Sequence, residues 1–271
     1  MSALPILAAA AARLPPLGLG LWKAPKGEAG AAVLEAVKAG YRLLDGAAVY
    51  GNEAEVGVAI KQAIDSGLCT RSELTVVSKC FNTMHVWKGD TSRPEAALRK
   101  TLADLQLEKV DVYLIHWPFA FEEVDIAQFG PMRGADGAPN PKIIMQIEYL
   151  ETFRAMIELK KKGLCTTLGV CNLTLEQLQE LVAAFPDDPP EILQVELHPY
   201  LAQPELTAYC KTQGITIMAY SPLGSGDSYA NICPRDREEL PRDRAALGLG
   251  TPSLPRTAFA RQVLRRLLIT K

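Results

Sequence analysis

The chain has 271 residues, of which 48% are hydrophobic, and this is enough to bury the core of one large α/β domain or of two small ones. The formal net charge is -2 and the sequence pI is about 6.0, so the charge favours neither a nucleic-acid partner nor a membrane partner. The six cysteines show no CxxC spacing, which is typical of reduced thiols in an intracellular protein and implies no metal site.

The N-terminal residues 4–12 are apolar and rich in alanine. They faintly resemble the apolar region of a secretion signal, but no basic residue precedes them. We therefore expect a short structural element here rather than a cleaved leader. The sequence holds no run of about 18 apolar residues, so no membrane span is expected.

Seven short apolar segments alternate with amphipathic stretches along the chain. The segments are nearly continuous in apolar residues, as in buried strands, and the stretches between them repeat apolar residues with the period of a helix. The predicted strands are 17–22, 41–45, 74–79, 110–116, 166–171, 192–197 and 215–220. This strict alternation predicts a parallel sheet, and at this length a (β/α)8 TIM barrel. The alternative is a doubly wound open sheet, but no GxGxxG motif links a strand to a helix.

Three of the predicted helices begin with a residue that commonly caps a helix, followed three positions later by Glu or Gln. The pairs are Asn52 with Glu55, Ser92 with Glu95, and Thr174 with Gln177. In such a capping box each side chain accepts a hydrogen bond from the backbone of the other residue. We expect all three pairs to form capping boxes.

Two parts of the chain depart from the alternation. Residues 119–141 are rich in glycine, proline and acidic residues and predict a long loop, of the kind that often covers or lines a binding site. Beyond Gly226 the pattern becomes irregular, and the eighth unit of the barrel is incomplete or divergent. Residues 259–268 favour an amphipathic helix, and a short eighth strand at 267–270 is the alternative.

Three neighbouring predicted strands each end in a side chain that can do chemistry. These residues are Asp45, Lys79 and His116, and Tyr50 follows Asp45 by five positions. Because the C-terminal ends of parallel strands share one rim, the four side chains should meet there. Taken singly, each has a structural explanation: an ion pair, a packed loop aromatic or a core histidine. Their joint placement favours an active site.

The chemistry expected at this rim is carbonyl reduction. A tyrosine has an ordinary pKa near 10, and a neighbouring ammonium such as that of Lys79 lowers the pKa. Asp45 would hold Lys79, and His116 would donate a hydrogen bond to a substrate oxygen. Tyr50 then acts as a general acid beside an oxyanion-binding group. Side chains cannot donate hydride, so a nicotinamide cofactor is implied.

Seven motifs in the chain, taken together and in order, resemble those of the aldo-keto reductases. They occupy residues 18–22, 45–53, 77–79, 114–118, 169–172, 194–200 and 219–224. The resemblance implies a single barrel domain over 1–271, in which 1–226 match the family well and 227–271 form a divergent tail. It also implies NADP(H)-dependent interconversion of carbonyls and alcohols by a cytoplasmic monomer. The expected partner is a small carbonyl or alcohol, with no nucleic acid and no membrane.

The resemblance also implies roles for individual residues. Tyr50 is the proton donor, Lys79 lowers its pKa, Asp45 supports Lys79, and His116 orients the carbonyl. The cofactor-binding set is Trp22, Asp45, Cys171, Asn172, Gln194, Tyr220, Ser221, Leu223 and Ser225. The substrate-binding set is Trp22, Phe81, His116, Trp117 and Phe119, which would form an apolar wall around the catalytic histidine. His85 and His198 are expected to be structural.

Within the cofactor-binding set, Asn172 and Gln194 match the residues that hold the nicotinamide carboxamide. Cys171 stands where the family usually has serine. Tyr220 matches the aromatic residue stacked on the nicotinamide ring, and Ser221, Leu223 and Ser225 match the pyrophosphate loop.

The tail leaves a second function open. In the family, strand 8 is followed by a basic, proline-containing segment that binds the adenosine 2′-phosphate and then by a loop that sets substrate specificity. Neither is evident in residues 227–271. The alternative is a catalytically weak or inactive relative that acts as a cofactor-sensing or binding module. The substrate and the preference between NADP and NAD stay open.

Overall fold

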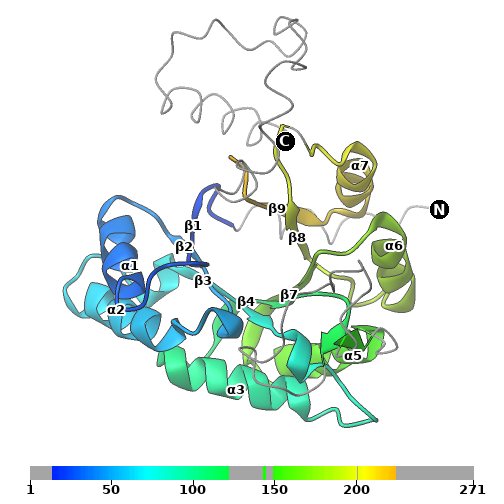
Figure 1. Ribbon diagram of the computed structural model, residues 1–271, viewed down its shortest axis with the longest axis horizontal. Coiled ribbons are helices and arrows are strands. Elements are labelled where there is room, and N and C mark those ends of the chain that lie inside the picture. The colour runs from blue at the N-terminus through cyan, green and yellow to red at the C-terminus, as the bar shows by residue number, and fades with distance from the viewer. Residues whose placement is uncertain (1–13, 122–142, 145–148, 200, 224–271) are drawn as a thin grey trace, which may run out of the picture. The chain divides into compact units, whose positions relative to one another are not determined.

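A seven-stranded sheet with the order β1-β2-β3-β4-β7-β8-β9 organises the fold (Figure 1). The computed structural model describes residues 14–121, 143–144, 149–199 and 201–223. The strands are β1 Gly18–Gly20, β2 Leu43–Asp45, β3 Thr75–Cys80, β4 Val110–Ile115, β7 Cys165–Cys171, β8 Ile192–Glu196 and β9 Thr216–Tyr220. All seven predicted strands are confirmed, and the neighbouring strands from β1 to β8 pair in parallel.

The strand order distinguishes the two predicted architectures. A doubly wound sheet reverses its strand order at a switch point, where the ligand binds. Here the strands of the main sheet follow one another in chain order without a reversal, as they do in a (β/α)8 barrel. The barrel is thus the fold class, and the doubly wound alternative is wrong. The expected N-terminal element at 4–12, most of the 119–141 loop and the eighth unit lie outside the described residues.

The described helices connect successive strands of the sheet. They are α1 Ala29–Lys38, α2 Glu53–Asp65, α3 Arg93–Leu105, α5 Tyr149–Lys161, α6 Leu175–Ala184 and α7 Pro204–Gln213. Short 3-10 turns occur at η3 Ala48–Tyr50, η4 Arg71–Glu73 and η5 Asn82–Met84, and β5 Ala120–Phe121 pairs antiparallel with β6 Ile143–Ile144. In the described part of the chain, no helix is long and apolar enough to cross a membrane.

Side chains alternate between the two faces of each strand, and each face has its own buried cluster. The outer face packs against the helices through residues such as Leu44, Val76 and Tyr113. The inner cluster consists of Leu43, Val77, Val112, Leu114, Cys171 and Ile192. Asp45 and Lys79 stand two positions after Leu43 and Val77, so the same alternation places them on the inner face.

The three predicted capping boxes have different outcomes. Thr174 is extended (ψ 170°), and its Oγ1 accepts from the Gln177 backbone N–H at 3.3 Å, while the Gln177 side chain accepts from Thr174 N at 3.0 Å. The predictions at Asn52 and Ser92 are wrong, because their ψ angles of 5° and -18° are not the extended ones that a capping side chain requires. Asn52 Nδ2 donates to Leu21 O at 3.0 Å, and Ser92 Oγ donates to Asp90 at 2.6 Å.

The described residues fall into two compact units. The larger unit holds those up to Val195 together with Glu205–Met218, and the smaller holds Glu196–Pro204 and those from Ala219 onward. Within the smaller unit, Leu197 N donates to Tyr220 O at 3.3 Å and His198 Nε2 lies 3.1 Å from Glu196 Oε1.

Candidate active site

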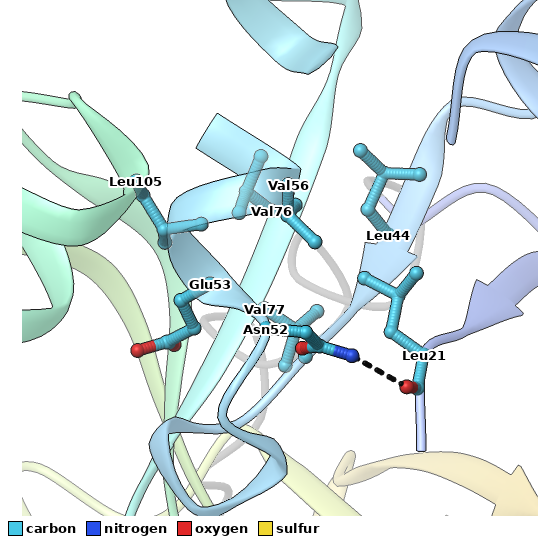
Figure 2. A pocket seen from close by; sticks show the side chains of 9 residues that line it. Leu21, Leu44, Asn52, Glu53, Val56, Val76, Val77 and Leu105 are labelled. Carbon is cyan, nitrogen blue, oxygen red and sulfur yellow. Dashed lines mark hydrogen bonds between the residues drawn. The ribbon is translucent and has the colours of Figure 1, made fainter. Parts of the chain in front are cut away.

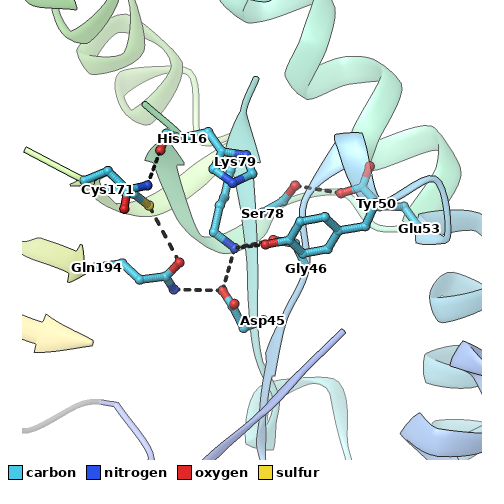
Figure 3. A network of polar contacts seen from close by, with 10 residues as sticks. Asp45, Gly46, Tyr50, Glu53, Ser78, Lys79, His116, Cys171 and Gln194 are labelled. Carbon is cyan, nitrogen blue, oxygen red and sulfur yellow. Dashed lines mark hydrogen bonds and ion pairs between the residues drawn. The ribbon is translucent and has the colours of Figure 1, made fainter. Parts of the chain in front are cut away.

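The ammonium group of Lys79 is the centre of a polar network on the inner face of the sheet (Figure 3). Its Nζ donates to Asp45 Oδ1 at 2.8 Å, to Gly46 O at 2.8 Å and to the Tyr50 hydroxyl at 3.4 Å. The Lys79 side chain is only 1% exposed. Burial lowers the pKa of Lys79, but the Asp45 carboxylate, Tyr50 and Cys171 together more than offset burial and hold the pKa above its ordinary value. Lys79 is therefore a permanently charged group at neutral pH.

Tyr50 reaches this ammonium from the short turn that follows β2. It closes η3, its backbone N–H donates to Ala47 O at 2.9 Å, and the chain then turns at Gly51 with a φ of +68°. Burial raises the pKa of Tyr50 by more than the nearby Lys79 charge lowers it, and the net direction is upward. The expectation of a lowered pKa considered only the ion pair and left out burial. A raised pKa keeps the hydroxyl protonated at neutral pH, as a proton donor must be.

His116 lies just beyond β4, and its ring packs edge-on against the Tyr50 ring with centroids 5.9 Å apart. Burial, and after it the Lys79 charge, lower the pKa of His116 to about 3, so the imidazole is neutral. Its buried Nδ1 has no hydrogen-bond partner among the described residues. A neutral imidazole offers one N–H donor. This ring can therefore donate one hydrogen bond to an uncharged ligand oxygen without adding a positive charge to the site.

The three residues expected to hold a carboxamide lie together at the ends of β7 and β8. Cys171 Sγ donates to Gln194 Oε1 at 3.7 Å, and Asn172 Nδ2 donates to His116 O at 2.9 Å. Gln194 Nε2 donates to Asp45 Oδ1 at 3.0 Å, the same oxygen that accepts from Lys79. A primary amide has two N–H donors and two acceptor lone pairs, so Gln194 keeps one of each for a ligand. This donor set suits the carboxamide of a nicotinamide.

An aromatic wall adjoins the histidine. Phe81 packs edge-on against His116 at 5.8 Å and against Phe121 at 5.6 Å, and Phe119 contacts both Phe121 at 5.7 Å and Trp117 at 5.6 Å. The structure thus brings Phe81, Trp117 and Phe119 into a single cluster, and their substrate-binding role stays a prediction. Phe121 was missed, although its position two residues after Phe119 was a usable signal in an extended segment.

Two buried polar side chains form hydrogen bonds with the backbone of the aromatic wall, and nothing in the sequence marked them as functional. Asn82 Nδ2 donates to Phe119 O at 2.6 Å. His85 Nε2 lies 3.0 Å from Trp117 O, and its Nδ1 lies 2.9 Å from Thr152 Oγ1. Burial lowers the pKa of His85 to about 4, so it is neutral as well. The structural role predicted for His85 is confirmed, and it supports the backbone beneath Trp117.

The remaining predicted residues lie in other parts of the chain. Trp22 follows β1 and is 58% exposed, and within the described ranges no ring contact links it to the aromatic wall. The Lys23 ammonium lies 4.3 Å from the centroid of the Trp22 ring. Tyr220, Ser221 and Leu223 belong to the smaller unit, where Leu223 is 49% exposed. Ser225 lies outside the described residues.

Comparison with known proteins gives a consistent result. The family model described as Aldo/keto reductase family matches residues 16–242. Aldo-keto reductase family 1 member A1 of Mus musculus is 44% identical over 229 residues, which are 84% of this chain and 67% of that protein. The protein of the same name from Homo sapiens is 45% identical over 217 residues, or 79% of this chain and 63% of that protein. The chain thus spans about two thirds of the length of these relatives.

Solved structures of the family also resemble this one. A Bombyx mori aldo-keto reductase in complex with NADP has a TM-score of 0.63 at 34% identity, with 77% of this chain and 62% of that chain covered. The aldose reductase from Schistosoma japonicum has a TM-score of 0.70 at 32% identity, with coverage of 83% and 72%. The family-model match, the sequence identities and the likeness of fold show that the chain belongs to the aldo/keto reductase family.

Proposed function

We propose that this protein is an NADP(H)-dependent oxidoreductase that reduces an aldehyde or ketone to an alcohol, with Tyr50 as the proton donor. The observation that carries the proposal is the hydrogen bond between the Tyr50 hydroxyl and the buried Lys79 ammonium, with the neutral His116 ring beside it. The proposal includes a single barrel domain over residues 1–271, a monomeric state and a cytoplasmic location, which size-exclusion chromatography and cell fractionation can test.

The chain's own residues would hold the cofactor at two places. Gln194, Asn172 and Cys171 would bind the nicotinamide carboxamide, and Tyr220 would stack on the ring. The loop residues Ser221, Leu223 and Ser225 would bind the pyrophosphate. NADPH, when bound, supplies the hydride that no side chain can provide. The NADP complex of the Bombyx mori relative supports this choice of nucleotide.

The proton steps follow from the electrostatics of the site. The substrate carbonyl oxygen accepts hydrogen bonds from the Tyr50 hydroxyl and from an N–H of His116. As negative charge develops on that oxygen, Tyr50 transfers its proton to it. The Lys79 ammonium stabilises the resulting phenolate, and Asp45 keeps the ammonium in place. General acid catalysis of this kind contributes about 10²- to 10⁴-fold to the rate.

The aromatic wall favours carbonyl compounds with apolar substituents. Phe81 packs against His116 and Phe121, and Phe121 packs against Phe119, so a ligand oxygen at the histidine would place its substituents near these rings. The proposed substrate class is therefore aldehydes and ketones with an apolar or aromatic group.

The first test is titration of the purified protein with NADPH and NADH, in which quenching of the tryptophan fluorescence reports nucleotide binding. Micromolar NADPH binding supports the proposal. Absence of binding by either nucleotide in a folded sample contradicts it. Binding of NADPH without consumption of the cofactor by any aldehyde in a panel would instead favour the cofactor-sensing alternative.

The second test is Tyr50→Phe, which should lower kcat by about 10²-fold or more while leaving NADPH affinity nearly unchanged. Tyr41→Phe is the matched control, because Tyr41 precedes β2, at the opposite end of the strand from Asp45. A Tyr50→Phe variant with turnover near that of the Tyr41→Phe variant would rule out Tyr50 as the acid.

A further inference from the structure

Two buried polar residues follow the Tyr50 turn directly, and neither belongs to the catalytic set. Asn52 and Glu53 are each only 5% exposed. Figure 2 shows Asn52 reaching Leu21 at the end of β1, where its Nδ2 donates to the backbone oxygen at 3.0 Å. Both side chains line a small cavity beneath the turn, whose other walls are mainly apolar. The turn that carries Tyr50 is therefore anchored by polar groups inside the protein.

Glu53 is the more unusual of the two. Its Oε1 accepts from Ser78 Oγ at 2.6 Å and its Oε2 accepts from Thr101 Oγ1 at 3.0 Å, with Ser78 and Thr101 themselves almost fully buried. Within the described residues, no lysine or arginine forms an ion pair with it. Burial raises the pKa of Glu53, the two hydroxyl hydrogen bonds lower it, and the net direction is upward. A buried carboxyl group without a cation is costly, so its place next to the catalytic turn requires a reason.

The geometry supplies that reason. Ser78 immediately precedes Lys79 on β3, and because side chains alternate along a strand, Ser78 faces the helices while Lys79 faces the inner network. Glu53 follows Tyr50 by three positions, at the start of α2. The Glu53–Ser78 hydrogen bond thus joins the segment that carries Tyr50 to the strand that carries Lys79, on the opposite side of the sheet from their own contact (Figure 3).

The contact between Lys79 and Tyr50 is sensitive to small shifts of the two segments that the Glu53–Ser78 hydrogen bond joins. Lys79 Nζ and the Tyr50 hydroxyl are 3.4 Å apart, near the outer limit for a hydrogen bond. The start of α2 is also seated closely on the end of α3, because a Cβ at Gly57 would meet Asp104 O and Leu105 C at 2.6 Å. Because α2 packs closely against α3, the position of Glu53 relative to Ser78 is well defined.

We propose that Glu53 and Ser78 are positioning residues that hold the Tyr50 hydroxyl in contact with the Lys79 ammonium. The inference rests on the proposed function, in which that contact prepares the proton donor. Thr101 has a different task, since its hydroxyl connects Glu53 to α3 and not to β3.

The experiment compares Ser78→Ala with Thr101→Val. Each variant removes one of the two hydroxyl donors to the same carboxyl group, so the two should lower the Tm to a similar extent. Only Ser78→Ala removes the hydrogen bond between β3 and Glu53, and it should lower kcat by about tenfold with the NADPH Kd unchanged, because small misplacements of reacting groups are costly. Thr101→Val should keep kcat within about twofold of wild type.

A second readout needs neither cofactor nor substrate. The alkaline titration of Tyr50 is followed by phenolate absorbance, with the same variant carrying Tyr50→Phe subtracted as background. Ser78→Ala should move this titration to higher pH, because the ammonium that favours the phenolate is no longer held near it. Thr101→Val should leave the titration in place. Ser78→Cys keeps the side-chain volume with a weaker hydrogen bond, so it should give an intermediate shift if the alanine variant does not fold.

The outcomes separate this inference from the proposed function. If wild-type protein reduces no carbonyl, the proposed function fails, yet the titration of Tyr50 still decides whether Ser78 positions it. If Ser78→Ala, or Ser78→Cys in its place, leaves both kcat and the Tyr50 titration as in wild type, the inference is overturned. Equal loss of kcat in Ser78→Ala and Thr101→Val would also overturn it, because the network would then act only on stability.

Discussion

Replacing Lys79 with methionine removes the charge at the centre of the site while keeping most of the side-chain volume. Three acceptors lose a hydrogen bond: Asp45 Oδ1 and Gly46 O, each at 2.8 Å, and the Tyr50 hydroxyl at 3.4 Å. The carboxylate of Asp45 then has no cation beside it, and the phenolate of Tyr50 loses the group that stabilises it. Both stability and carbonyl reduction should therefore fall.

The size of the stability change follows from burial. Removing one partner of a buried ion pair costs about 3–5 kcal/mol. Asp45 keeps the donor Gln194 Nε2 at 3.0 Å and its side chain is 17% exposed, so solvent and the amide compensate in part. We place Lys79→Met at the lower end, about 3 kcal/mol. For a protein of this size that corresponds to a fall in Tm of about 6–12 °C.

Lys61→Met is the matched control. The Lys61–Asp65 ion pair on α2 also has an N–O distance of 2.8 Å, but its side chains are 62% and 61% exposed. Exposed pairs of this kind contribute about 0.5 kcal/mol or less. Thermal and urea unfolding of both variants, followed by circular dichroism, provide the comparison. An equal loss of stability in the two variants would refute the argument that burial determines the strength of the Lys79 pair.

The same pair predicts a sign for the pH dependence. Folding raises the pKa of Lys79 above its ordinary value of 10.5. The stabilisation is thus fully present at every pH below that value and is lost as pH rises through the higher folded pKa. The difference in unfolding free energy between wild type and Lys79→Met should accordingly stay constant across neutral pH. A difference that disappears between neutral pH and about pH 9 would contradict this sign.

Three further predictions use other parts of the structure. Burial holds the pKa of His85 at about 4, against 6.5 in the unfolded chain, so on acidification the unfolded state binds a proton before the folded state does. The free energy of unfolding should therefore decrease as the pH is lowered, by about 2 kcal/mol at pH 5. His85→Gln should flatten this part of the stability curve, and an unchanged curve would contradict the assignment. Thr174→Ala should cost about 1 kcal/mol, whereas Ser92→Ala, at a helix start without a side-chain cap, should cost less than half as much in urea unfolding. Cys171→Ser should tighten NADPH binding by about two- to tenfold, because a hydroxyl bonds Gln194 more strongly than a thiol does, and weaker binding would disprove this.

The sequence by itself determined the order of the elements and the rim on which the proposed catalytic side chains lie. Strand and helix periodicities are local properties of the chain, so they can be read without knowledge of the fold. The alternation of side chains along a strand is equally local, and once the strands are parallel neighbours it brings Asp45 and Lys79 to one face. The four residues proposed as catalytic needed no more information than this.

Tertiary structure alone decided the properties that depend on burial and on distant contacts. The pKa of Tyr50 lies above its ordinary value because the packed site desolvates the hydroxyl more strongly than one ammonium can offset. Asn52 does not cap its helix, and its side chain instead donates to a distant acceptor, Leu21 O, 31 positions earlier in the chain. The hydrogen bond between Asp45 and Gln194 joins residues 149 positions apart. A local pattern cannot encode such a contact, since only the folded arrangement of the sheet brings β2 and β8 together.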